Sequence, residues 1–186
     1  MAQDREKIHL NVPIHRQTKN FTCVPSCCKM MLDYLNKVKL TIPEPDLDED
    51  QIAEIMNTTI SGTRISEVEN INDILTTSNP SVEFVAEFKP HTLDDIKKEL
   101  QKGLPVSVWI HTGSVEYLHS IVITGIDDIA KTICYNDPIY GQKTISQSEF
   151  VTKWEQGQAL MIKTEIGRIN RYTLETWQQE LSDEQP

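Results

Sequence analysis

Residues 12–32, VPIHRQTKNFTCVPSCCKMML, place a cysteine at the point where an amphipathic helix is expected to begin. The helix is predicted from about Cys23 to Asn36, because Cys27 and the apolar residues after it recur at helical spacing and Pro25 suits a first turn. A helix N-terminus favours an anion, and the thiolate is the reactive form of a cysteine that is otherwise mostly protonated at neutral pH. Cys23 is therefore a candidate nucleophile.

Three further side chains, far apart in the sequence, supply the partners that a reactive cysteine needs. His119 lies in the apolar run LHSIVITG, and Asp137 follows another β-rich run in CYNDPIYG. A histidine accepts the thiol proton, and a carboxylate holds the imidazole in one tautomer and orientation. Gln17 stands six residues before Cys23, and its amide can donate a hydrogen bond to a developing oxyanion.

In this order, the four residues resemble the site of the papain-like cysteine peptidases. The resemblance is to the bacteriocin-processing (double-glycine leader) peptidases and their stand-alone relatives, and it covers about residues 12–162. It includes the segments VPIHRQ, TCVPSCCKMMLDY, GLPVSVWI, HSIVITGID, YNDPIYG and SEFVTKW. It implies that Cys23 is the nucleophile, His119 the general base and Asp137 the residue that orients it. It also implies that Gln17 and the Cys23 backbone N–H are the oxyanion donors.

The activity that the resemblance implies is thiol-dependent hydrolysis of a peptide or protein substrate through an acyl-enzyme, without a cofactor or metal ion. Acyl transfer to an amine would use the same groups. In the family, the segment that holds Ser148, Phe150 and Trp154 is structural and packs beneath the sheet.

Two alternatives concern the members of the site. Asn136 competes with Asp137, because papain-type enzymes can use an amide as the third member. Neighbours along a strand point to opposite faces, so only one of these two side chains can face His119; the resemblance favours Asp137. His15 rivals His119 because it stands beside Gln17. His15 is nevertheless expected at the surface, as are His9, His91 and His111.

The chain also departs from the family pattern. Many relatives have Gly directly after the cysteine and Ala two residues further on, where this chain has Val24 and Ser26. The β-branched Val24 is expected to narrow the cleft. A second hypothesis is therefore a catalytically weak or inactive papain-like module that binds a peptide or protein partner. A third is a redox sensor that pairs Cys23 with Cys27, where Cys27 is expected to face the core and Cys28 to turn away.

The pattern of expected elements predicts an α+β fold: a papain-like cysteine proteinase fold with an N-terminal helical half packed on a C-terminal antiparallel β-sheet. Helices are expected at 23–36, 51–57, 65–75, 92–102 and 147–154, and strands at 81–88, 105–110, 119–124, 132–136 and 159–163. Leu10–Ile14 is expected to be a short strand or an extended arm. Residues 1–163 should form the peptidase domain, and 164–186 a polar tail with a helix near 174–181.

Composition excludes several other classes. The 186 residues carry a formal net charge of -10, which argues against nucleic acid or an anionic membrane as the main partner. No apolar run reaches the length of a membrane span, and the polar N-terminal segment lacks the apolar stretch of a signal peptide, so we expect a cytoplasmic protein. Four cysteines without a secretion signal predict neither disulfides nor a zinc site. The acidic run 44–54 is interpreted as a solvated helix start in preference to a docking surface for a basic peptide.

Overall fold

The computed structural model describes residues 7–75, 80–113 and 118–167. The helices are α1 (Cys23–Val38), α2 (Glu49–Ile55), α3 (Leu93–Gln101) and α4 (Gln147–Gln156), with a 3₁₀ helix η1 (Ile65–Asp73) after α2. The strands are β1 (Lys7–His9), β2 (Ser81–Glu87), β3 (Val106–His111), β4 (Leu118–Asp127), β5 (Thr132–Asp137), β6 (Gly141–Ser146) and β7 (Met161–Gly167).

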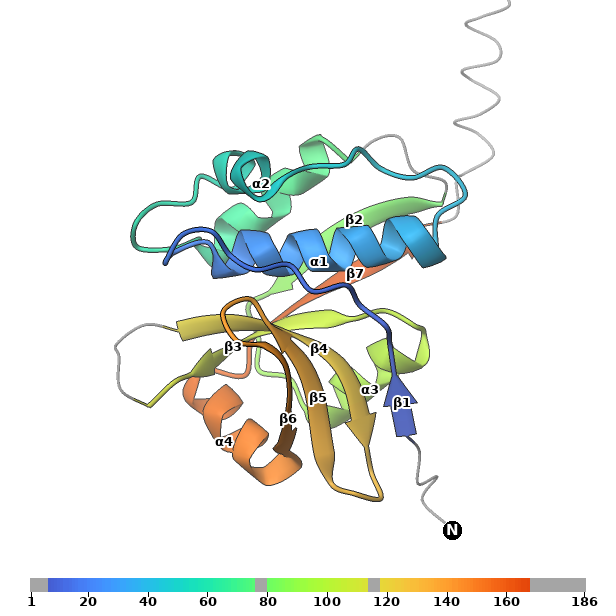
Figure 1. The fold of residues 1–186 in the computed structure, drawn as a ribbon, viewed down its shortest axis with the longest axis vertical. Coiled ribbons are helices and arrows are strands. Elements are labelled where there is room, and N and C mark those ends of the chain that lie inside the picture. Colours follow the sequence, from blue (N-terminus) through green and yellow to red (C-terminus); the bar gives the residue numbers. More distant parts are fainter. Residues whose placement is uncertain (1–6, 76–79, 114–117, 168–186) are drawn as a thin grey trace, which may run out of the picture.

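The strands form one seven-stranded antiparallel sheet in the order β2-β7-β3-β4-β5-β6, with β1 paired to β4. Figure 1 shows α1 and α2 on one side of this sheet and α3 and α4 on the other. The expected α+β arrangement, with helices from the first half packed on an antiparallel sheet, is therefore confirmed. Among the described residues, no helix has both the length and the apolar character needed to span a membrane.

Each face of the sheet has its own hydrophobic core. Side chains alternate along a strand, so Val108 of β3 packs in the cluster beneath α3 and α4, whereas its neighbour Trp109 belongs to the cluster beneath α1. Phe150 and Trp154 stack in the α4 layer with their ring centroids 5.4 Å apart. Both are almost fully buried, as the structural segment was expected to be.

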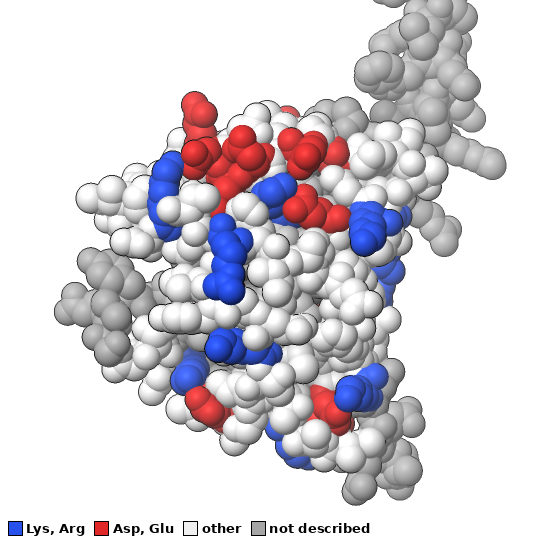
Figure 2. Space-filling model, viewed as in Figure 1, with Lys and Arg blue, Asp and Glu red and all other residues white. Residues whose placement is uncertain are grey.

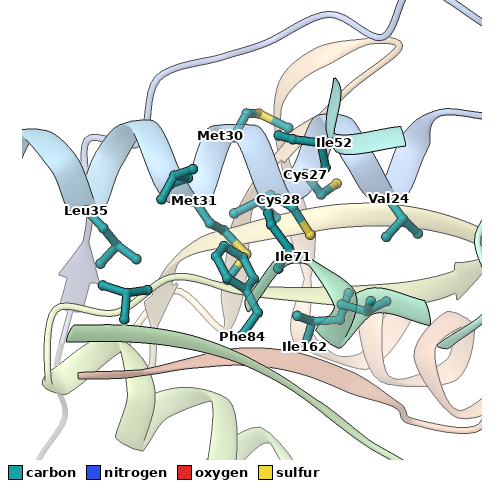
Figure 3. Packing of buried hydrophobic residues seen from close by; sticks show 14 of the residues in the cluster. Val24, Cys27, Cys28, Met30, Met31, Leu35, Ile52, Ile71, Phe84 and Ile162 are labelled. Atoms are coloured by element: carbon teal, nitrogen blue, oxygen red, sulfur yellow. The ribbon is translucent and has the colours of Figure 1, made fainter. Parts of the chain in front are cut away.

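Helix α1 is the centre of the other core. Met30, Met31 and Leu35 are fully buried, and Figure 3 shows Leu35 on the sheet side of the helix and Met30 on the other side, near Ile52 of α2. Cys27 is buried as expected, but Cys28 is equally buried, so the expectation that Cys28 turns away is wrong. The core surrounds α1 on more sides than a single amphipathic stripe, because α2 and η1 also pack against it.

The remaining differences lie at element boundaries. Strand β6 was not predicted, because GQKTIS is polar and exposed along most of its length. Leu10–Ile14, expected to be a short strand or an extended arm, runs as an extended arm that begins with a hydrogen bond from Leu10 N to Thr124 O, and the strand before it lies at Lys7–His9. Strand β7 continues to Gly167. The division of the chain at residue 163 stays a prediction, and the expected tail helix lies outside the described residues.

Candidate active site

Cys23 is the first residue of α1 and the more accessible of the thiols on that helix. Its side chain is partly exposed, whereas Cys27 and Cys28 are fully buried, and burial raises the pKa of both of those thiols. All four cysteines are free. A solvent-accessible thiol at a helix N-terminus, such as Cys23, is in the environment typical of a reactive cysteine. The buried thiols of Cys27 and Cys28 are in the environment typical of inert cysteines.

Strands β4 and β5 bring His119 and Asp137 together. His119 Nε2 lies 3.0 Å from Asp137 Oδ1. Val122 pairs with Asn136 across the two strands, so His119, three residues before Val122, and Asp137, one after Asn136, share the opposite face. Regular sheet geometry therefore places the imidazole beside the carboxylate.

Asn136 points to the other face of the sheet. Its Nδ2 donates to the Val12 carbonyl oxygen at 3.0 Å, and the side chain is almost fully buried. Of the two candidates for the third member, only Asp137 contacts His119 in the structure.

One oxygen of Asp137 is the acceptor for several donors. Besides His119, Oδ1 accepts hydrogen bonds from the backbone N–H groups of Ile139 at 2.7 Å and Tyr140 at 3.1 Å. Burial works to raise the pKa of this carboxyl, but the hydrogen bond and charge of His119 and the two backbone donors lower it below its usual value. The turn after β5 thus holds an ionised carboxylate against the imidazole.

The environment of His119 favours the imidazolium. Burial by itself lowers the pKa of this largely buried histidine, but hydrogen bonding and electrostatic attraction to Asp137 and Cys23 raise the pKa to about 9. With Nε2 occupied by Asp137, the other ring nitrogen is the one left to face the Cys23 thiol. At neutral pH the site therefore holds a protonated histidine between a carboxylate and a sulfur.

Gln17 approaches the same place from the loop before α1. Its backbone N–H donates to the Pro138 carbonyl oxygen at 2.9 Å, which ties the loop to the turn that carries Asp137. Its Nε2 donates to the Lys19 carbonyl oxygen at 2.7 Å, while Oε1 is buried. One of the two amide N–H bonds is thus engaged within the loop, and the second is left for another acceptor.

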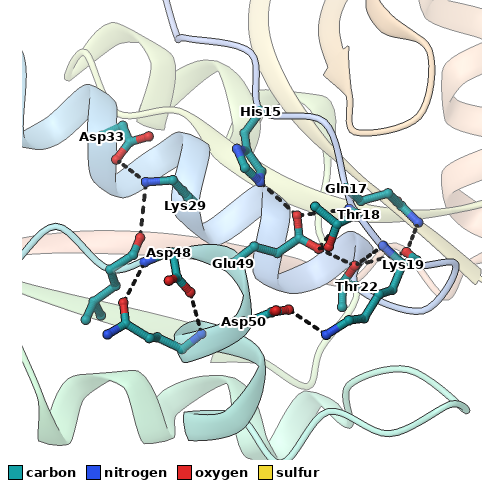
Figure 4. A network of polar contacts seen from close by, with 12 residues as sticks. His15, Gln17, Thr18, Lys19, Thr22, Lys29, Asp33, Asp48, Glu49 and Asp50 are labelled. Carbon is teal, nitrogen blue, oxygen red and sulfur yellow. Dashed lines mark hydrogen bonds and ion pairs between the residues drawn. The ribbon is translucent and has the colours of Figure 1, made fainter.

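The loop that holds Gln17 is hydrogen-bonded to Glu49, a residue that was not predicted from the sequence to have a role at the site. Glu49, at the start of α2, lies in the acidic run, and Figure 4 shows its carboxylate among His15, Thr18 and Thr22. Its side chain is only 4% exposed. Hydrogen bonds from Thr22, from Thr18 and from His15 lower its pKa, although burial alone would raise it. No signal in the sequence separates Glu49 from the exposed acids around it.

The rest of the acidic run behaves as the start of a helix. Asp48 and Gln51 form a capping box at the N-terminus of α2. Acidic side chains gather over α2 and the loop before it on the face shown in Figure 2, with lysines among them. Lys19 pairs with Asp50 at 2.6 Å, and Lys29 with Asp46 at 3.2 Å.

Three further expectations need correction. Val24 is 2% exposed and lies in the core beneath α1 (Figure 3), so it does not narrow the cleft as expected. His91 was expected at the surface, but its side chain is 4% exposed and sits against Glu87. His15 is only partly exposed because it contacts Glu49. Within the described part of the chain, no cluster of metal-ligating side chains occurs.

Solved structures of similar shape define the class. The peptidase domain of Streptococcus ComA, a bi-functional ABC transporter involved in a quorum sensing pathway, superposes with a TM-score of 0.64 at 16% identity, covering 85% of this chain and 100% of that one. A double glycine motif protease from an AMS/PCAT transporter, in complex with the leader peptide, superposes with a TM-score of 0.59 at 16% identity. The match covers 85% of this chain and 94% of that one. The peptidase domain of Streptococcus mutans ComA superposes with a TM-score of 0.54 at 17% identity, covering 82% of this chain and 98% of that one. The fold is that of the papain-like cysteine peptidases.

The family follows from the sequence match. The model of the Peptidase_C39 like family matches residues 9–161, and this chain belongs to that family. No curated protein matches the chain. The matched range contains both halves of the site described above, the Gln17–Cys23 segment and the His119–Asp137 pair.

Proposed function

We propose that this protein is a thiol-dependent peptidase in which Cys23, His119 and Asp137 act as a triad and Gln17 assists. The observation that carries the proposal is the imidazole of His119, which is hydrogen-bonded to Asp137 at 3.0 Å and has its pKa raised by both Asp137 and Cys23. An imidazolium beside a thiol at a helix N-terminus is the arrangement that activates a cysteine nucleophile.

The first half of the reaction forms an acyl-enzyme. The Cys23 thiolate attacks the carbonyl carbon of the scissile peptide bond, and the carbonyl π electrons move to the oxygen. The resulting oxyanion accepts hydrogen bonds from the free N–H of the Gln17 amide and from the Cys23 backbone N–H. The His119 imidazolium gives its proton to the leaving amine, the C–N bond breaks, and a thioester remains on Cys23.

The second half releases the acid product. Neutral His119 removes a proton from water, the hydroxide attacks the thioester carbon, and the thiolate leaves as the imidazolium is restored. Asp137 keeps one orientation of the imidazole in both halves and stabilises its positive charge. An amine in place of water would give acyl transfer with the same groups.

The burial of Val24 supports catalysis over the binding-module hypothesis. That hypothesis was motivated by the departures at Val24 and Ser26 and by the polar tail, and the Val24 side chain is packed in the core instead of narrowing the cleft. The buried state of Cys27 likewise speaks against the redox sensor, because an oxidant must reach both thiols. A module that only binds a peptide has no need of an imidazole held between a carboxylate and a thiol.

The substrate that we propose is a peptide or protein segment that enters the site in an extended form. One structurally similar protease is a double glycine motif protease bound to a leader peptide, so a peptide with Gly-Gly before the scissile bond is the first substrate to try. Purified protein would be incubated with such a peptide carrying a fluorogenic leaving group, and cleavage would be located by mass spectrometry. Cys23→Ala is the control.

We expect cleavage by the wild type and none by Cys23→Ala. The binding-module alternative predicts that both proteins bind peptides equally and that neither cleaves them. A broad peptide library in place of the single Gly-Gly peptide would extend the search to other substrates.

A further inference from the structure

We propose that Glu49 is a positioning residue for the oxyanion hole: its buried carboxylate holds the loop 15–22 in the shape that aims Gln17 and the Cys23 N–H at the substrate oxygen. This inference rests on the proposed peptidase function and adds a residue from α2 to it. Glu49 itself acts on the reaction only through that loop.

The contacts come from both ends of the loop. Glu49 Oε1 accepts from the Thr18 backbone N–H at 2.9 Å, the Thr18 hydroxyl at 2.8 Å and the Thr22 hydroxyl at 2.6 Å. The second oxygen, Oε2, lies 2.8 Å from His15 Nε2. One carboxylate therefore ties together three residues that are spread over eight positions of the loop (Figure 4).

The two threonines among these contacts each adjoin a proposed oxyanion donor. Thr18 follows Gln17 directly, and Thr22 precedes Cys23 directly. The Thr22 hydroxyl makes no capping hydrogen bond to α1, although threonine at that position usually makes one. It is committed instead to Glu49, so the carboxylate fixes the backbone just before the Cys23 N–H.

Because Glu49 is buried, the conformation of the loop 15–22 should be sensitive to loss of its carboxylate. A buried carboxylate is tolerated only when its oxygens are hydrogen-bonded, and all the donors to Glu49 in the described structure belong to the loop. Glu49 itself is carried by α2, which packs against α1. Replacing the carboxylate by an amide leaves one acceptor oxygen and sets an NH2 group against the remaining loop contacts, so part of the network is lost and the loop loosens while α1 and the sheet stay in place.

The test compares Glu49→Gln with two reference variants. Gln17→Ala removes one oxyanion donor directly. Asp48→Ala removes the cap of α2 without touching the loop 15–22, and it controls for general loosening of α2. For each variant, kcat and KM are measured with the fluorogenic Gly-Gly peptide, and alkylation of Cys23 by iodoacetamide is followed by mass mapping. Alkylation forms no oxyanion, so it reports only the thiol and its imidazole.

Glu49→Gln should lower kcat by about 10-fold or more, because small misplacement of a reacting group has effects on that scale. KM and the rate of Cys23 alkylation should change by less than about 3-fold, and Asp48→Ala should keep kcat close to wild type. In a double variant, Glu49→Gln should add little to Gln17→Ala, because both act on the same donor.

Two results would overturn the inference while leaving the peptidase intact. One is a wild-type kcat in Glu49→Gln. The other is a fall in alkylation that matches the fall in kcat, with losses that multiply in the double variant, because Glu49 would then support the whole site. A wild type that cleaves no peptide, with Cys23 alkylated no faster than Cys134, instead removes the proposed function itself.

Discussion

The two halves of the candidate site are held in different ways. His119 and Asp137 stand on adjacent strands, where backbone pairing between β4 and β5 sets their spacing and face. Gln17 and Cys23 lie in a loop and at a helix start, where side-chain hydrogen bonds to the buried Glu49 set the backbone. Sheet register needs no particular side chain, whereas the loop depends on one carboxylate. The strand half should therefore tolerate changes around it, and the loop half should not.

Asp137→Asn should give the largest loss in the strand half, about 10³-fold in kcat/KM, because the imidazole loses its orienting carboxylate. The alkaline limb of the pH profile should move as well. His119 must be protonated, and it loses its proton as the pH rises through about 9. Removal of the Asp137 charge removes one of the effects that raise the pKa of His119, so the midpoint of the alkaline limb should move to a pH below 9.

A limb that stays near pH 9 in Asp137→Asn would show that the carboxylate does not set the charge of His119. The pH dependence of stability tests the same contact between His119 and Asp137. The raised pKa of His119 contributes stability below the unfolded pKa of about 6.5, and this contribution is lost as the pH rises through about 9. The wild-type Tm should therefore fall over that range more steeply than the Asp137→Asn Tm.

Gln17→Ala should lower kcat by about 10²-fold, because it removes one donor to the oxyanion. The alkylation rate of Cys23 should stay within about 2-fold of wild type, since that reaction makes no oxyanion. Kinetic assays with the Gly-Gly peptide and mass mapping after iodoacetamide measure the two quantities in parallel. Equal losses in both would mean that Gln17 supports the thiol and not the oxyanion.

Asn136→Ala should have the smallest effect on turnover, within about 2-fold, although it is adjacent to Asp137. Its side chain is buried on the opposite face and donates to the Val12 carbonyl oxygen. Loss of that hydrogen bond should lower the free energy of unfolding by about 1–3 kcal/mol, measurable by urea denaturation. A large loss of kcat with unchanged stability would reverse the assignment of Asp137 and Asn136.

The sequence predicted the strand half well because that half depends on periodicity. Alternation along β5 predicts that Asn136 and Asp137 face opposite sides of the sheet, and the family resemblance favoured Asp137 as the residue that orients His119. The helix start at Cys23 was equally visible from Pro25 and the apolar spacing after it. The fold class followed from the same patterns, while β6 was missed because its exposed, polar residues carry no apolar alternation.

The loop half was only partly predictable. Glu49 stands among other acidic residues, most of them exposed, and its burial depends on contacts with residues about 30 positions earlier in the chain. The inward direction of Val24 and Cys28 was missed for a related reason: α2 and η1 cover more of α1 than one amphipathic face suggests. Local spacing does not reveal which elements pack around a helix.

The most direct test of the central claim is the rate of Cys23 alkylation by iodoacetamide across pH, read by peptide mass mapping, in the wild type and in His119→Ala. We predict that Cys23 reacts well before Cys27, Cys28 and Cys134 in the wild type. Its rate should persist below pH 8.5, the pKa of free cysteine being about 8.5, and should fall in His119→Ala. A Cys23 that reacts no faster than Cys134, and whose rate is the same in His119→Ala, would contradict the thiolate–imidazolium pair on which the account depends.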